Sequence, residues 1–211
     1  GDIDGLLVRA ADADIDGDVV RNATVTALTA GGVDGVLIDA LDGDITNLVL
    51  DADLALADVS ATGMIDGFQV RSKDTDIDGT NLLNGVVTVL GTAVGDGALL
   101  DATAGDIRNV DVTSEGDADS GLADITASDD IDDLTVRAQD AVIDADNIRN
   151  GEVTVLGAGG VDLVAGTRIT AVEGSITNLT VNAELALADI SAEDAADRKS
   201  TRLNSSHIAV S

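Results

Sequence analysis

The stretch that decides the fold is ITNLVLDA at residues 45–52, because the same eight-residue phrase returns along nearly the whole chain. Close copies are IRNVDVTS at 107–114 and ITNLTVNA at 176–183. The copies start at residues 3, 20, 33, 45, 54, 65, 82, 95, 107, 120, 131, 148, 164, 176 and 185. Such regular repetition indicates that one short structural unit is used many times.

The phrase alternates between apolar and polar positions. Its sixth residue is Val, Ile or Leu in every copy, its seventh is polar in every copy, and its eighth is usually Ala. This period of two is typical of a half-buried β-strand. The third residue is Gly, Asn or Asp except at Leu56, Leu122 and Leu187. Because Gly, Asn and Asp tolerate a positive φ, the third position predicts a turn before each strand.

Three long repeats contain the short ones and span residues 3–64, 65–130 and 131–196. They open with IDGLLVRAADADIDG, IDGFQVRSKDTDIDG and IDDLTVRAQDAVIDA, and they close with LADVSA, LADITA and LADISA. Helical repeats would need apolar residues at a spacing of three and four. The pattern instead predicts an all-β chain, a parallel β-solenoid (β-helix) of stacked short strands. A β-sandwich is the alternative, but it does not require one phrase to recur so often.

The composition excludes several classes of function. The chain has 40 acidic and 11 basic residues, a net charge of −29, and no Cys. A nucleic-acid partner is excluded because phosphates require a basic surface. Disulfides and zinc–thiolate sites are excluded because they require Cys. The uncharged run at 79–95 is too short and too polar for a membrane span. At 45% hydrophobic, the chain is also too apolar for ordinary acidic disorder.

The last residues differ in character from the repeats. The string DRKSTRLNSSH at 197–207 reads as the translation of a common sequencing adapter, and it includes His207, the only histidine. We therefore expect residues 1–196 to form a single β-solenoid and residues 197–211 to be an artefactual, disordered tail. We also expect the chain to be a fragment of a larger metagenomic reading frame that continues into further repeats. Exposed solenoid ends would let such a fragment self-associate.

One motif could hold a metal ion. It reads DADIDG at 12–17 and DTDIDG at 74–79, and becomes DAVIDA at 140–145. Carboxylates spaced along a tight glycine turn can converge on Ca²⁺, which needs six to eight oxygen ligands. The candidate ligands are Asp12, Asp14, Asp16, Asp74, Asp76 and Asp78. An EF-hand is excluded because its twelfth position, normally Glu, is Ala23 or Gly85. The alternative is that these residues are solvated and reflect salt adaptation or solubility.

The sequence does not point to an enzyme. A Ser-His-Asp triad lacks its base once His207 is assigned to the tail. Paired carboxylates could hydrolyse sugars, but Phe68 is the only aromatic residue that could stack on one, and its position predicts the core. The sequons NAT at 22–24 and NLT at 178–180 suggest glycosylation, yet Asn22 and Asn178 already serve as predicted turn residues.

The phrases ITNLVLDA, IRNVDVTS and ITNLTVNA resemble the β-helical shafts of large repetitive bacterial exoproteins of the filamentous-haemagglutinin and autotransporter kind. The resemblance covers nearly all of residues 3–196 and concerns architecture. It implies an extracellular or cell-surface location, a structural or adhesive role, and a surface or glycan partner. Two alternatives stay open. One is a polysaccharide-acting β-helix whose active site lies elsewhere, and the other is a module that folds when it binds calcium.

Overall fold

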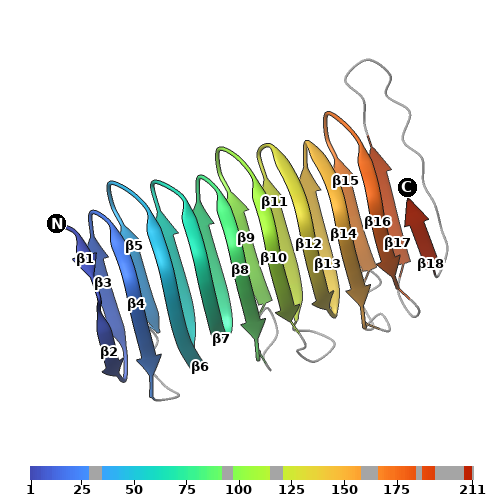
Figure 1. The fold of residues 1–211 in the computed structure, drawn as a ribbon. Helices are drawn as coiled ribbons and strands as arrows, with labels where there is room; N and C mark the ends of the chain where they lie inside the picture. Colours follow the sequence, from blue (N-terminus) through green and yellow to red (C-terminus); the bar gives the residue numbers. More distant parts are fainter. Residues whose placement is uncertain are drawn as a thin grey trace.

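The computed structural model describes residues 1–28, 35–91, 97–114, 121–157, 166–183, 187–192 and 207–210. These residues form an all-β parallel solenoid without a helix, which confirms the predicted fold class. Figure 1 shows the strands stacked in a long row, with the first coil at one end and the last strand at the other. No helix that could span a membrane occurs in the described ranges.

In the part of the chain that the structure describes, eighteen strands are paired into one continuous sheet that winds around the core. The strands are β1 (Ile3–Asp4), β2 (Leu7–Ala10), β3 (Ala13–Gly17), β4 (Val20–Ala27), β5 (Val36–Ala40), β6 (Ile45–Ala61), β7 (Ile65–Gly79), β8 (Leu82–Val89), β9 (Gly97–Ala102), β10 (Ile107–Ser114), β11 (Leu122–Ala127), β12 (Asp130–Ala138), β13 (Asp140–Ala145), β14 (Asn147–Val155), β15 (Gly166–Ala171), β16 (Ile176–Asn182), β17 (Leu187–Ala192) and β18 (His207–Val210).

The chain alternates between two faces of the solenoid. Face A contains β1, β2, β4, residues 45–52 and 65–72, β8, β10, β12, β14 and β16. Face B contains β3, β5, residues 56–61 and 74–79, β9, β11, β13, β15 and β17. Strands β6 and β7 are long enough to enter both faces. All neighbours within each face run parallel, apart from β18, which pairs with β16 in the antiparallel sense.

The pairing register places one aliphatic residue at the start of each coil. This column consists of Ile3, Val20, Ile45, Ile65, Leu82, Ile107, Ile131, Ile148 and Ile176. Its members are separated by as few as 17 residues (from 3 to 20) and as many as 28 (from 148 to 176). Loops of different length therefore close coils of the same cross-section. The division into three long repeats stays a sequence prediction.

Phe68 lies in the core, as its phrase position predicts, and is 1% exposed. The next coil makes room for its ring at Gly85. A Cβ atom at Gly85 would lie 2.0 Å from Cζ of Phe68. A large side chain in one coil is thus matched by a missing side chain in the next, which keeps the core closely packed.

The third position of the phrase adopts the predicted positive φ in every coil of face A, but after Gly5 it lies inside a strand rather than in a turn before one. Its φ angle lies between 50° and 70°, and the residues are Gly5, Asn22, Asn47, Gly67, Asn84, Asn109, Asp133, Asn150 and Asn178. Face B differs at Gly97 and Gly166, where no positive φ is found. These glycines are required instead by close packing, because a Cβ atom would lie 2.6 Å and 2.7 Å from the carbonyl oxygens of Leu122 and Leu187.

The asparagines of face A also hydrogen-bond to one another along the solenoid. Asn47 Nδ2 donates to Asn22 Oδ1 (3.0 Å), and Asn22 Nδ2 donates to Asp4 Oδ1 (2.7 Å). The same Asp–Asn–Asn series recurs at residues 66, 84 and 109 and at residues 132, 150 and 178. Both sequon asparagines, Asn22 and Asn178, therefore use their amide nitrogens inside this ladder.

Candidate functional site

The DxDxDG segments are mostly strands rather than the glycine turns that the sequence analysis expects. Asp14 and Asp16 lie in β3, with Asp12 just before it, and the second copy lies in the last part of β7. The isoleucines between the aspartates, Ile15 and Ile77, point into the core. The period-two position of these isoleucines is the signal that could have identified the strands.

The aspartates project from face B and stack with residues of neighbouring coils. We call the stack through Asp76 the middle column. It contains Asp14, Leu37, Asp58, Asp76, Leu99, Asp124, Val142, Arg168 and Asp189. We call the stack through Asp78 the acidic column. It contains Asp16, Asp39, Ser60, Asp78, Asp101, Thr126, Asp144, Thr170 and Ser191.

The structure therefore groups the candidate ligands differently from the sequence motif. Asp76 and Asp78 lie beside Asp58 and Asp101 from adjacent coils, whereas Asp16 lies beside Asp39. Consecutive side chains in a column are separated by roughly the 4.8 Å spacing between paired strands. The two DxDxDG motifs belong to different coils and do not meet. No sequence motif marked Asp58 or Asp101, because their proximity depends on the coil lengths.

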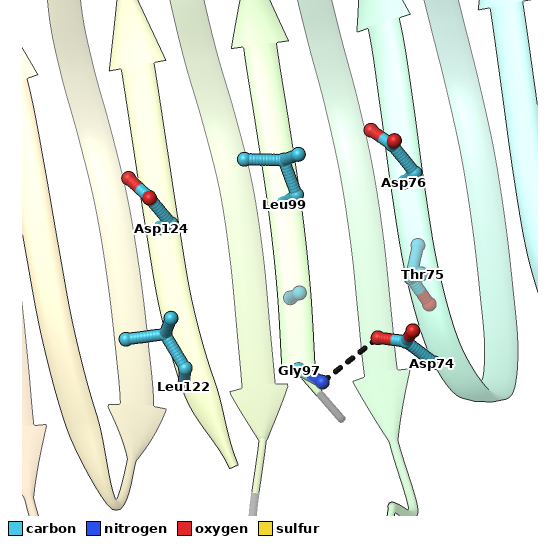
Figure 2. Close-up of a pocket in the computed structure, with 8 residues that line it drawn as sticks. Asp74, Thr75, Asp76, Gly97, Leu99, Leu122 and Asp124 are labelled. Atoms are coloured by element: carbon cyan, nitrogen blue, oxygen red, sulfur yellow. Dashed lines mark hydrogen bonds between the residues drawn. The ribbon is translucent and has the colours of Figure 1, made fainter. Parts of the chain in front are cut away.

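A hollow of about 260 Å³ opens on face B beside Gly97. It is lined by Asp74, Asp76, Leu99, Leu122 and Asp124, whose side chains are drawn in Figure 2, together with Thr75, Gly97 and Ala98. Oδ1 of Asp74 accepts a hydrogen bond from the backbone N–H of Gly97 at 2.8 Å. Asp140 makes the same contact with Gly166, also at 2.8 Å.

The carboxylates of this surface raise one another's pKa values. Burial, followed by the charges of Asp78, Asp58, Asp74 and Asp101, raises the pKa of Asp76 to about 6. Its Oδ1 atom is buried and has no hydrogen-bond partner. Burial and a neighbouring carboxylate also raise the pKa of Asp58, Asp78 and Asp124. Because like charges lie one coil apart, the surface attracts protons and cations.

The six predicted calcium ligands do not form a preformed metal cage. Within the described ranges, no group of three or more His, Cys, Asp or Glu side chains is arranged to hold a metal ion. Alternate residues of one strand point the same way but are spaced along the strand, so Asp74, Asp76 and Asp78 approach a common point only if their side chains bend together. Calcium binding by these residues stays a prediction.

Face A is less acidic and carries exposed apolar side chains. Val49 and Val86 are 41% and 45% exposed, and they border a hollow of about 250 Å³ that Arg71 also lines. Arg71 Nε lies 3.0 Å from Asp53 Oδ1. Since face A lacks the stacked carboxylates of face B, it offers sites for matched control substitutions.

Comparison of the chain with protein-family models, curated proteins and solved structures finds no match.

Proposed function

We propose that this chain is a structural or adhesive segment of a large, repetitive protein that is secreted or displayed at the cell surface. The observation that supports this proposal best is the unbroken register from Ile3 to Ile176. In such a stack each coil buries its apolar residues against its neighbours, so the stability of the stack grows as coils are added. The architectural resemblance to exoprotein shafts supports the extracellular location.

A non-enzymatic role is part of the proposal. The outward side chains of face B are mainly short aspartates, threonines, serines and leucines, and the aromatic Phe68 is buried. The same carboxylates would keep neighbouring molecules apart by charge repulsion. The alternative is that the chain belongs to a polysaccharide-acting protein whose active site lies in another domain.

The sequence of the flanking DNA and the response of the protein to a pulling force test the proposal that the chain is part of a shaft. We expect further units of 62 to 66 residues on both sides of this segment, matching the spans 3–64, 65–130 and 131–196. Pulling residues 1–196 from their ends in an atomic-force microscope should give stepwise rupture of coils. An aromatic-rich flanking domain that releases reducing ends from a polysaccharide would contradict the proposal and support the alternative.

Calcium-dependent folding is the second candidate function, favoured by the unpartnered Oδ1 of Asp76 among four other carboxylates. We expect millimolar Ca²⁺ to raise the melting temperature of residues 1–196 more than Mg²⁺ or NaCl of equal ionic strength. The Asp76→Asn variant should lose the increment, whereas Asp111→Asn on face A should retain it. Circular dichroism during heating measures both. If only molar salt raised the melting temperature, the carboxylates would be hydrated surface groups and not calcium ligands.

A further inference from the structure

We propose that the hollow over Gly97 is a docking site for an extended, basic polypeptide segment, which inserts an arginine or lysine side chain between Leu99 and Leu122. This inference goes beyond the shaft role and does not depend on it. The partner would carry a side chain with a positive charge at the end of an apolar stem. The shape of the hollow, its charges, and an arginine that the same chain places on the same surface support such a partner.

The hollow combines apolar walls with carboxylates. Leu99 and Leu122 are 41% and 40% exposed, and Leu99 is the register neighbour of both Asp76 and Asp124. The volume of the hollow is about 260 Å³, below the roughly 300–1,000 Å³ of sites for drug-sized ligands. The hollow therefore suits a single side chain. Long basic side chains pack their methylene groups on apolar surface and keep the charged group at its polar edge. Figure 2 shows Leu99 lying between Asp76 and Asp124.

The carboxylates around the hollow would favour a bound cation. Each charged group that shifts the pKa of Asp76 is another carboxylate, contributed by β6, by β7 itself and by β9. These groups are Asp58, Asp74, Asp78 and Asp101. One oxygen of Asp76 has no hydrogen-bond partner. A guanidinium or ammonium group placed here would relieve repulsion and gain a partly buried partner.

The third predicted repeat supplies such a cation from within the chain. At the position equivalent to Leu99 it has Arg168, and at the position equivalent to Asp76 it has Val142. Arg168 Nη2 lies 2.9 Å from Asp144 Oδ2, and its charge opposes the rise in the pKa of Asp124. Face B therefore already accommodates an arginine paired with a carboxylate of the preceding coil. The second repeat offers the carboxylates but has a leucine at the arginine's position.

The distribution of charge favours a polypeptide over a single small cation. Asp58, Asp76, Asp78, Asp101 and Asp124 lie on successive coils of the middle and acidic columns. One exposed ion pair contributes little, whereas several basic residues on one segment add their pairs without separate losses of translational entropy. An extended segment along the solenoid can reach several of these coils.

Fluorescence anisotropy with a labelled Arg-Leu-Arg-Leu-Arg peptide tests the site. We expect Leu99→Arg, which copies Arg168, to fill the hollow and weaken binding by about tenfold, and Asp76→Asn to do the same. The matched controls are Val86→Arg and Asp111→Asn, which make the same charge changes on exposed positions of face A. We expect both controls to bind within about twofold of the parent protein.

The comparison between faces decides the outcome. Equal losses of affinity in the face A controls would show unspecific attraction to an acidic protein and would overturn the proposal. Unchanged peptide binding by Leu99→Arg, or no peptide binding by the parent protein, would overturn it as well. Both face B substitutions point outward, and circular dichroism checks that each variant folds. Asp124→Asn provides an independent variant of the same hollow. A calcium effect without peptide binding would support the second candidate function and contradict this site.

Discussion

At the scale of single residues, the asparagines of face A carry out two tasks at once. Asn84 adopts a φ of 53°, donates to Asp66 at 2.7 Å, and accepts from Asn109 at 2.8 Å. Its left-handed backbone conformation occurs within β8, and its side chain connects three coils by hydrogen bonds. Few other residues tolerate this backbone and also both donate and accept.

Substitutions at Asn84 should separate the two tasks. Asn84→Gly keeps the backbone but loses the ladder bonds, so we expect a loss of about 1 kcal/mol in the free energy of unfolding. Asn84→Ala adds the penalty of a left-handed backbone and should cost about 1–2 kcal/mol more. Urea unfolding measures both values, with the exposed Thr135→Ala as control. Equal effects of Gly and Ala would contradict the role of the positive φ.

At the scale of the elements, each strand alternates between core and solvent. Sequence periodicity was sufficient to predict this alternation, since it depends only on neighbours two residues apart. It was insufficient for face B, where DADIDG and DTDIDG resemble turns because aspartate and glycine are rare in strands. Tertiary pairing with β5, β6 and β9 overrides that local preference.

The pairing of these strands predicts an unusual pH dependence. Burial and the neighbouring carboxylates raise the pKa of Asp76 from its ordinary 3.8 to about 6, so the folded state holds this proton more strongly. This contribution to stability is complete below about pH 3.8 and is lost as the pH rises through about 6. Asp58, Asp78 and Asp124 shift in the same direction.

We therefore expect the protein to be more stable at pH 5 than at pH 7.5. After allowance for solvent screening, Asp76 contributes about 1 kcal/mol to the difference. Asp76→Asn should raise the melting temperature at pH 7.5 and flatten its dependence on pH, whereas Thr135→Ala on face A should leave the dependence unchanged. Thermal denaturation at closely spaced pH values provides the measurement. Greater stability of the parent protein at pH 7.5 would refute the argument.

At the scale of the whole molecule, the ends of the stack differ from its middle. β3 pairs only with β5, and Leu7 of the first coil is 78% exposed. At the other end β18 pairs with β16, although its residues belong to the tail that the sequence analysis expects to be disordered. Residues 193–206 lie outside the described ranges.

The open edge of the first coil predicts self-association of residues 1–196. Unpaired backbone groups of an edge strand can pair with another chain. We expect the apparent mass in size-exclusion chromatography to rise with protein concentration, and to rise more at high salt, where repulsion between the acidic surfaces is screened. A monomer at every concentration and salt level would show that the ends are protected.

The sequence by itself determined the features that depend on neighbouring residues. Val25 and Leu50 could be assigned to the core, and Asn22 and Asn47 to a positive φ, because both assignments follow from local periodicity and backbone preference. The tertiary structure alone decided which residues stack. Coils of 17 to 28 residues bring Asp76 beside Asp58 and Leu99, and Leu122 against Gly97. Such contacts depend on how the loops close each coil, and no local pattern encodes that closure.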